Sequence, residues 1–306
     1  MRVFVAGATG ALGRRLVPLL AEKGHEVTGT TRTEGKAALL EELGAIPVVL
    51  DALDRDAVVE TLGELDPDVV VHQLTAIDAI GSNMRRFDHA FAATNRLRTE
   101  GTDNLLAGAP HARFIAQSYA GWPFARTGGP VKTEDDPLDD EPPRGLRETL
   151  AAIRHVESRT LAAGGLVLRY GGFYGPGTSL SPGGEQVEMV RKRLYPVIGD
   201  GGGMWSFVHI EDAAEATALA VEEGASGIYN IVEDDPTPVR ELVPLLAESA
   251  GAKPPRHLPG WLARIVAGEA AMAMMTEIRG ASNEKAKREL GWAPRHATWR
   301  EGFLAA

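Results

Sequence analysis

The chain has no cysteine among its 306 residues, which excludes disulfide bonds, a thiol nucleophile and a cysteine-ligated metal. It has no apolar run close to the ~18 residues of a membrane-spanning helix, and no leader-type pattern follows Met1. Its net charge of −10 argues against nucleic acid and anionic membranes as partners. These absences predict a cytoplasmic protein that acts on a small molecule.

Short β-branched runs alternate with helical segments through the first half of the chain. Because strands that alternate with helices of about ten residues form parallel sheets covered on both faces, the pattern predicts a doubly wound α/β fold. The strands are expected in "RVFVAG", "HEVTGTTR", "AIPVVLDAL", "DPDVVVHQL", "ARFIAQSY" and "GLVLRYGGFYG", with helices such as "LGRRLVPLLAEKG" and "RDAVVETLGEL" between them.

The regular alternation stops after Gly171, which predicts a second, smaller lobe. We expect a cofactor-binding domain at 1–171 plus 205–232 and a C-terminal α/β substrate lobe at 172–204 plus 233–306. Within the smaller lobe, "GWLARIVAGEAAMAMM" is expected to form a helix. The Pro-, Gly- and acid-rich segment 125–145 predicts a long surface loop and a candidate lid.

A glycine-rich turn follows the first expected strand. Gly7, Gly10 and Gly13 have the spacing of a dinucleotide cradle, in which the glycines allow a tight turn, close approach of a pyrophosphate and close helix packing. The helix that follows offers free N–H groups and a positive dipole end to the anion. The turn therefore predicts a Rossmann-type cofactor site.

The second expected strand ends in "TGTTR", where a site for NAD usually has an acidic residue. Arg32 stands there instead, and a guanidinium can bind the 2′-phosphate that an acid would repel. The sequence therefore favours NADP(H), with NAD(H) as the alternative, since Arg32 could also stack on an adenine ring.

Seven motifs in order resemble the extended short-chain dehydrogenase/reductases, the NAD(P)-dependent epimerase/dehydratase family: "GATGALG", "LDALD", "HQLTA", "TNRLRTEGTDNLL", "RYGGFYGPG", "WSFVHIEDAAEA" and "ASNEKAKRELGWAP". The fourth motif carries extra residues between Asn95 and Gly101. The resemblance implies a Rossmann domain with a substrate lobe, and a monomer or a homodimer that pairs through the 91–106 and 146–161 helices. It implies cofactor contacts from Gly7, Thr9, Gly10, Ala11, Leu12, Gly13, Arg32, Asp51, Ala52, Leu53, Gln73, Leu74, Thr75, Tyr170, Gly171 and Phe173.

The chain lacks the catalytic Tyr and Lys of that family. In the family, the Tyr exchanges a proton with the substrate and the Lys lowers the pKa of the Tyr. With Glu157 setting the helix register, these places hold Thr149 and Ile153, and none of the five tyrosines is followed four residues later by a lysine. The chain therefore resembles the atypical members of the family.

Two residues at the end of one strand are the candidates for the remaining chemistry. Ser118 matches the family serine that polarises the substrate oxygen, and Tyr119 is the nearest phenol along the chain. Strand alternation leaves open whether Tyr119 faces the site. His72, His155 and His209 are weaker candidates, with packing or solvation as the preferred interpretation of each.

Other chemistries find little support in the sequence. No metal-binding spacing is present, and the carboxylates in "DDPLDD" (Asp135, Asp136, Asp139 and Asp140) are expected to be solvated. The sequence therefore predicts an atypical NADPH-dependent oxidoreductase that acts on a carbonyl or an activated double bond. A sugar or sugar-nucleotide epimerase or dehydratase, and a non-catalytic cofactor sensor, are the alternatives.

Overall fold

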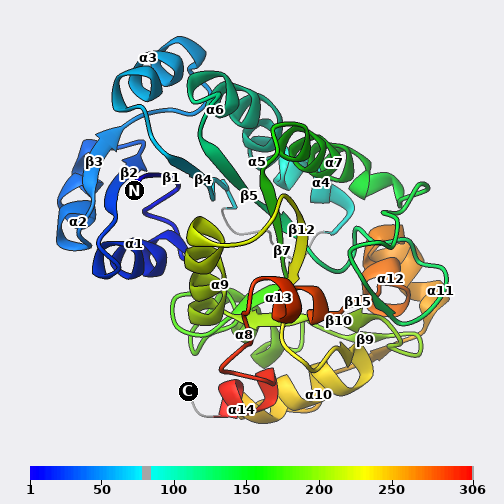
Figure 1. The fold of residues 1–306 in the computed structure, drawn as a ribbon. Helices are drawn as coiled ribbons and strands as arrows, with labels where there is room; N and C mark the ends of the chain where they lie inside the picture. The colour runs from blue at the N-terminus through cyan, green and yellow to red at the C-terminus, as the bar shows by residue number, and fades with distance from the viewer. Residues whose placement is uncertain (78–83, 305–306) are drawn as a thin grey trace.

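A sheet of seven parallel strands forms the centre of the residues that the computed structural model describes, 1–77 and 84–304 (Figure 1). From β1 the chain runs outward to β3 and then returns to β4 on the other side of β1. Such a reversal leaves a crevice at the carboxyl ends of the two strands, where ligands of this fold class bind. The order across the sheet is β12 (Gly227–Ile231), β7 (Leu166–Tyr170), β5 (Arg113–Tyr119), β4 (Val69–His72), β1 (Arg2–Ala6), β2 (Glu26–Thr31) and β3 (Ile46–Val49).

Alternate residues of each strand face opposite layers of helices, so the predicted doubly wound fold is confirmed. Val3 and Val5 lie in an apolar cluster with α1 and α9, whereas Phe4 and Ala6 lie in another with α3, α6 and α7. Figure 1 shows these two sets of helices on opposite sides of the sheet. Burying one such Val or Phe side chain contributes roughly 1.5–3 kcal/mol. The helices are α1 (Gly13–Glu22), α2 (Ala37–Glu42), α3 (Arg55–Leu65), α6 (Thr102–Gly108), α7 (Arg147–Ala162) and α9 (Ile210–Glu222), with a 3₁₀ turn, η1 (Glu34–Lys36), before α2.

The helical segment before α6 contains a π-helical turn, η3 (Leu97–Gly101). It lies where the sequence carries extra residues relative to the motif that it resembles. Such turns are rare in proteins and are frequently found at functional sites. Before it come η2 (Met84–Arg86), α4 (Phe87–Ala90) and α5 (Ala92–Arg96).

Strands β7 and β8 (Gly172–Tyr174) are separate, although one continuous strand was expected there. That expectation was wrong because Gly171 passes so close to the next segment that an added Cβ would lie 2.8 Å from the Ser206 carbonyl oxygen. The chain bends at this glycine, and β8 pairs with β11 (Phe207–His209) outside the main sheet.

The smaller lobe consists of short strand pairs and helices (Figure 1). The single helix expected in "GWLARIVAGEAAMAMM" is wrong, because Gly268 has a φ of +89° and separates α11 from α12. The division into two domains at the predicted boundaries remains our proposal. Further elements are α8 (Glu185–Arg191), β9 (Val197–Ile198), β10 (Met204–Trp205), β13 (Thr237–Pro238), α10 (Val239–Ser249), β14 (His257–Leu258), α11 (Gly260–Val266), α12 (Glu269–Thr276), β15 (Gly280–Ala281), α13 (Glu284–Glu289) and α14 (Trp299–Leu304).

The acidic segment 125–145 is tied to the smaller lobe. Its strand β6 (Val131–Lys132) pairs with β15, and the Arg126 guanidinium lies 2.9 Å from the Asp139 carboxylate. Asp139 is only 8% exposed, and Asp136 lies 2.9 Å from the Lys132 ammonium group. The expectation of merely solvated carboxylates was therefore wrong for these two residues, because each has a basic partner. A 3₁₀ turn, η4 (Arg144–Leu146), leads into α7.

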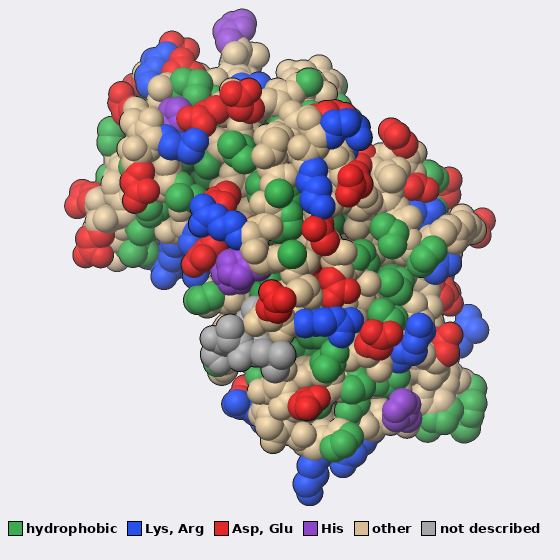
Figure 2. Space-filling model, turned by 60° about the horizontal axis from the view of Figure 1, so that its bottom comes forward, with side chains coloured by type: hydrophobic (Ala, Val, Ile, Leu, Met, Phe, Trp, Pro, Cys, Tyr) green, Lys and Arg blue, Asp and Glu red, His purple; other side chains and the backbone are tan. Residues whose placement is uncertain are grey.

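Charged side chains of both signs are interspersed on the face shown in Figure 2. Within residues 1–77 and 84–304, no helix is both long enough and apolar enough to cross a membrane.

A substitution at the bend tests the close approach of the two segments. Gly171→Ala should lower the free energy of unfolding by about 1–3 kcal/mol, because the added methyl group meets backbone atoms that cannot move aside. Gly63→Ala is the matched control, since open space surrounds Gly63 on α3 and alanine favours a helix by up to about 1 kcal/mol. Urea unfolding of both variants measures the difference, and equal stabilities would contradict the packing described.

Candidate functional site

The glycine turn lies at the crevice where the strand order reverses. Gly7 has a φ of +95°, and a Cβ there would lie 2.7 Å from the Gln73 carbonyl oxygen at the end of β4. A Cβ at Gly13 would lie 2.5 Å from the Gly7 carbonyl oxygen. Only glycine fits either place, so the turn holds the ends of β1, β4 and α1 together.

Exposed backbone at the start of α1 can receive an anion. Gly10 and Ala11 are exposed, and within the described residues the N–H groups of Ala11 and Leu12 donate to no acceptor. Thr9 is half-buried beside them. Free N–H groups at a helix start, over a glycine turn, fit a pyrophosphate, so these residues would hold the phosphates of a dinucleotide.

Arg32 stands directly beyond the end of β2 and is exposed, with no acidic partner among the described residues. Asp51 is exposed beyond the neighbouring strand, and its carboxylate accepts the N–H of Leu53 at 3.0 Å. Ala52 is buried, and its carbonyl oxygen accepts from the Asn104 side chain. The predicted adenosine-side residues thus lie at one edge of the sheet, with an unpaired cation among them.

The residues predicted to line the nicotinamide include Tyr170, whose hydroxyl already has two hydrogen-bond partners. The Tyr170 hydroxyl lies 2.7 Å from the Thr217 hydroxyl and accepts from the Gln73 amide at 3.1 Å. Burial raises the pKa of Tyr170 above its ordinary value. Its ring packs on Phe173, with ring centroids 5.3 Å apart. The Tyr170 hydroxyl therefore has structural partners only. Of the other residues predicted to line the nicotinamide, Gly171 is buried, Leu74 is half-buried and Thr75 is exposed.

The two α7 positions where the family has its Tyr and Lys hold residues that cannot transfer a proton. The Thr149 hydroxyl donates to Asp88 at 2.7 Å and accepts from the Asn95 amide at 3.1 Å. Ile153 is fully buried in an apolar cluster that includes Leu150. Both places thus contribute only to packing and to structural hydrogen bonds.

The Ser118 hydroxyl is committed to a buried ion pair. It donates to Glu157 Oε1 at 2.7 Å. Arg169 donates to both oxygens of the same carboxylate, each at 2.7 Å. Glu157 and Arg169 are 5% and 3% exposed. Sequence reasoning used Glu157 only to set the helix register and missed this network.

Tyr119 has a hydroxyl that remains free among the described residues. It is half-buried and packs against the cluster that contains Ile153 and Leu150. Its hydroxyl has no hydrogen-bond partner among the described residues. Burial raises the pKa of the Tyr119 phenol to about 12, so at neutral pH it is a hydrogen-bond donor and not a base.

His72 is buried and satisfied at the end of β4. Its Nε2 lies 3.2 Å from the Leu97 carbonyl oxygen, and its Nδ1 accepts from the Leu74 N–H at 3.3 Å. Burial lowers the pKa of His72 to about 4, so the ring is neutral at physiological pH. His72 thus links β4 to the π-helical turn.

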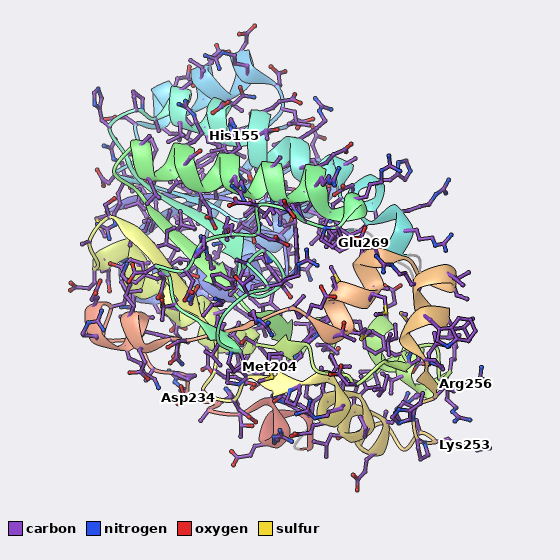
Figure 3. All side chains as sticks on the ribbon, turned by 90° about the vertical axis from the view of Figure 1, so that its right-hand side faces the viewer. His155, Met204, Asp234, Lys253, Arg256 and Glu269 are labelled. Atoms are coloured by element: carbon purple, nitrogen blue, oxygen red, sulfur yellow. The ribbon has the colours of Figure 1, made fainter. Side chains whose placement is uncertain are left out.

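The two other histidines have structural partners. His155 lies on the side of α7 away from the smaller lobe (Figure 3), and its Nε2 is 3.1 Å from the Asp103 carboxylate. His209 begins α9, where its Nδ1 accepts the Glu211 N–H at 3.4 Å. Neither pairing points to a role in proton transfer.

Sequence reasoning also missed Arg98, which the π-helical turn carries to a buried place beside Phe91. Its guanidinium carbon lies 5.9 Å from the centre of the Phe91 ring. The extra residues between Asn95 and Gly101 were the only signal in the sequence that this turn is unusual.

Comparison with known proteins agrees with this geometry. The family model described as NAD dependent epimerase/dehydratase family matches residues 3–232. A 3-diazoavenalumate denitrifying reductase from Streptomyces sp. is 41% identical over 309 residues, covering 99% of each chain. A 4-hydroxy-2-methyl-3-oxo-4-farnesyl-3,4-dihydroquinoline-1-oxide ketoreductase from Stigmatella aurantiaca is 28% identical over 334 residues, covering 100% of this chain and 95% of the other. UDP-glucose 4-epimerase from Thermus thermophilus, solved with NAD, shares the fold at 24% identity, with a TM-score of 0.72 and coverage of 99% and 97%.

The neutral state of His72 gives a pH test of its burial. Because the pKa of His72 falls from 6.5 to about 4, the unfolded chain binds a proton below pH 6.5 that the folded chain refuses. This one group should therefore remove about 3 kcal/mol of stability as the pH falls from 7 to 4. His72→Asn should flatten the pH dependence of urea unfolding by that amount. The exposed control His111→Asn should not, and identical slopes for both variants would reject the assignment.

Proposed function

The chain belongs to the NAD-dependent epimerase/dehydratase family, and on that footing we propose that it reduces the diazo group of a small molecule with NADPH, releasing N₂. It is an oxidoreductase of the atypical type, as the sequence predicts, and its cofactor is a nicotinamide dinucleotide. The choice of NADPH over NADH, the roles of individual residues and the substrate are our proposals.

The observation that carries the proposal is the loss of the proton-transfer pair. Thr149 has its hydrogen bonds satisfied by Asp88 and Asn95, and Ile153 is apolar, so these two positions of α7 offer no acid or base. The reduced nicotinamide, when bound, supplies a hydride, and replacement of a diazonium group by hydride gives the C–H product and N₂ without consuming a proton. A site that lacks the acid suits such a substrate, in keeping with the diazo reduction that the name of the 41%-identical relative describes.

Carbonyl reduction is the second candidate function. It is favoured by the unpaired hydroxyl of Tyr119, which could donate a proton or a hydrogen bond to a carbonyl oxygen, and by the ketoreductase relative. The raised pKa of Tyr119 argues against the reverse step, because oxidation of an alcohol needs a base. The epimerase alternative therefore has less support from this site.

Tyr119 separates the two candidate reactions. If the substrate is a diazonium compound, Tyr119→Phe should change kcat/KM by less than about threefold, because no oxygen is protonated. With a ketone substrate, the same change should lower kcat/KM by roughly 100-fold or more. Tyr229→Phe on distant β12 is the matched control. The measurement follows NADPH oxidation and N₂ release with 3-diazoavenalumate, a simple arenediazonium and a panel of ketones. If NADPH binds but no diazo compound is reduced, the diazo proposal fails.

Arg32 is the proposed partner of the NADPH 2′-phosphate. Arg32→Ala should weaken NADPH binding by roughly 10- to 100-fold, because a charge-assisted hydrogen bond to a phosphate is lost. NADH binding should change by less than about threefold. Lys36→Ala, which removes another exposed cation near the end of β2, is the control. Calorimetric titration of both cofactors measures the effect, and equal losses for NADPH and NADH would refute the phosphate contact.

A further inference from the structure

Arg98 is a buried cation for which the described residues provide no ion-pair partner. The side chain is 7% exposed, and neither its Nε nor its Nη1 has a hydrogen-bond partner in the parts of the chain that the structure describes. It forms no ion pair there either. A guanidinium has five N–H donors in a fixed planar fork and stays protonated in proteins.

Glu157, whose carboxylate interacts electrostatically with Arg98, already has its hydrogen-bond partners. Glu157 raises the pKa of Arg98, while burial lowers that pKa to about 10, so Arg98 remains charged at neutral pH. Both Glu157 oxygens bind Arg169, and one also accepts from Ser118. Two buried guanidinium groups thus share one carboxylate, which leaves one positive charge in excess.

A lone buried charge is costly, and structures keep buried guanidinium groups paired. His72, which feels the charge of Arg98, is neutral, and both of its ring nitrogens have backbone partners, so it supplies neither an anion nor an acceptor to Arg98. Since residues 1–77 and 84–304 supply no acceptor to these donors, an anion bound from solution would satisfy Arg98.

Arg98 lies beside the face of α7 where the catalytic pair is absent. It stands at the end of a row of aromatic rings that starts at Trp122. The centroids of Trp122 and Phe87 are 5.7 Å apart, and Phe87 stacks on Phe91 at 4.3 Å with an 18° angle. The Arg98 guanidinium follows at 5.9 Å from Phe91. Tyr119 and Ile153 belong to the same apolar cluster as these rings.

We propose that Arg98 binds the carboxylate of the substrate, and that the row of aromatic rings packs against a conjugated or aromatic part of the same molecule. A planar carboxylate matches the guanidinium fork with two hydrogen bonds, and flat apolar surface beside it matches the rings. This inference rests on the proposed function for the identity of the site. It narrows the proposed substrates to aryl or conjugated carboxylic acids. It also places a positive charge beside the face of α7 where Ile153 stands in place of the family's lysine.

Stability without ligand gives the first half of the test. Arg98→Met removes the excess buried charge at nearly constant volume, so thermal unfolding of the ligand-free variant should occur at the wild-type temperature or above it. Arg113→Met is the matched control. Arg113 donates to the carbonyl oxygens of Ala220, Glu223 and Gly224, and its loss should lower the unfolding temperature. Destabilisation of Arg98→Met to the extent of the control, or failure of this variant to fold, would show a structural role and overturn the proposal.

Ligand binding gives the second half. In calorimetric titrations of the NADP⁺-saturated protein, cinnamate should bind at least tenfold more tightly than cinnamamide, because the amide keeps the shape and loses the charge. Arg98→Met should bind cinnamate roughly 10- to 100-fold more weakly and show no preference for it, with NADP⁺ affinity within about twofold of wild type. The affinity of Arg98→Lys for cinnamate should lie between those of the wild type and Arg98→Met, because lysine keeps the charge but loses the planar fork.

Three outcomes would overturn the proposal: no preference for cinnamate in the wild-type protein, an undiminished preference in Arg98→Met, or a loss of NADP⁺ affinity as large as the loss for cinnamate. The readout is binding without turnover. A protein that binds cinnamate through Arg98 yet reduces no diazo compound would therefore refute the proposed reaction and leave this inference intact.

Discussion

The ion pair between Glu157 and Arg169 is the interaction on which the active-site arrangement depends. It joins α7 to β7 inside the protein, with both oxygens of the carboxylate bound at 2.7 Å. Removing one partner of such a buried pair typically costs about 3–5 kcal/mol. By fixing the register of α7, it turns Thr149 and Ile153 toward α5 and the apolar cluster, and it takes the Ser118 hydroxyl out of use.

What remains for chemistry follows from that constraint. With Ser118 committed, the strand end presents Tyr119, whose phenol is neutral and unpaired, and the neighbouring π-helical turn presents the cation of Arg98. The usual pair lowers a phenol pKa with a lysine so that the phenol can act in both directions. Here the pKa of the Tyr119 phenol is raised, and the positive charge belongs to Arg98 on the π-helical turn instead of a lysine on α7. The proposed site would bind and orient an anion, but it is poorly suited to removing a proton from an alcohol.

The fold could be predicted from the sequence because its signals are local. The strand and helix periods gave the doubly wound sheet, and the spacing of Gly7, Gly10 and Gly13 placed the cradle. The bend at Gly171 was missed because it depends on the close approach of Ser206, which is far away along the chain. The break at Gly268, where φ is positive, was missed because an isolated glycine can also stand inside a helical pattern. The absence of the Tyr/Lys pair was readable from the sequence, whereas the partners of Ser118 were not. Ser118, Glu157 and Arg169 meet only after α7 has packed on the sheet, and no periodic pattern records that contact.

Three of the residues with buried polar atoms that lack partners among the described residues belong to the segments around the proposed site. The Gln73 amide oxygen follows β4, the Asn95 amide oxygen lies beside Thr149, and Arg98 follows one turn later on the same helical segment. A fold that satisfies the buried polar groups of Ser118, Thr149 and Tyr170 so fully could have satisfied these by small changes of side chain. Natural sequences depart from local consistency mainly at functional sites, and contact with a ligand would satisfy these three groups. The charge on Arg98 makes it the most costly of the three to leave unpaired, and hence the one for which a ligand explains most.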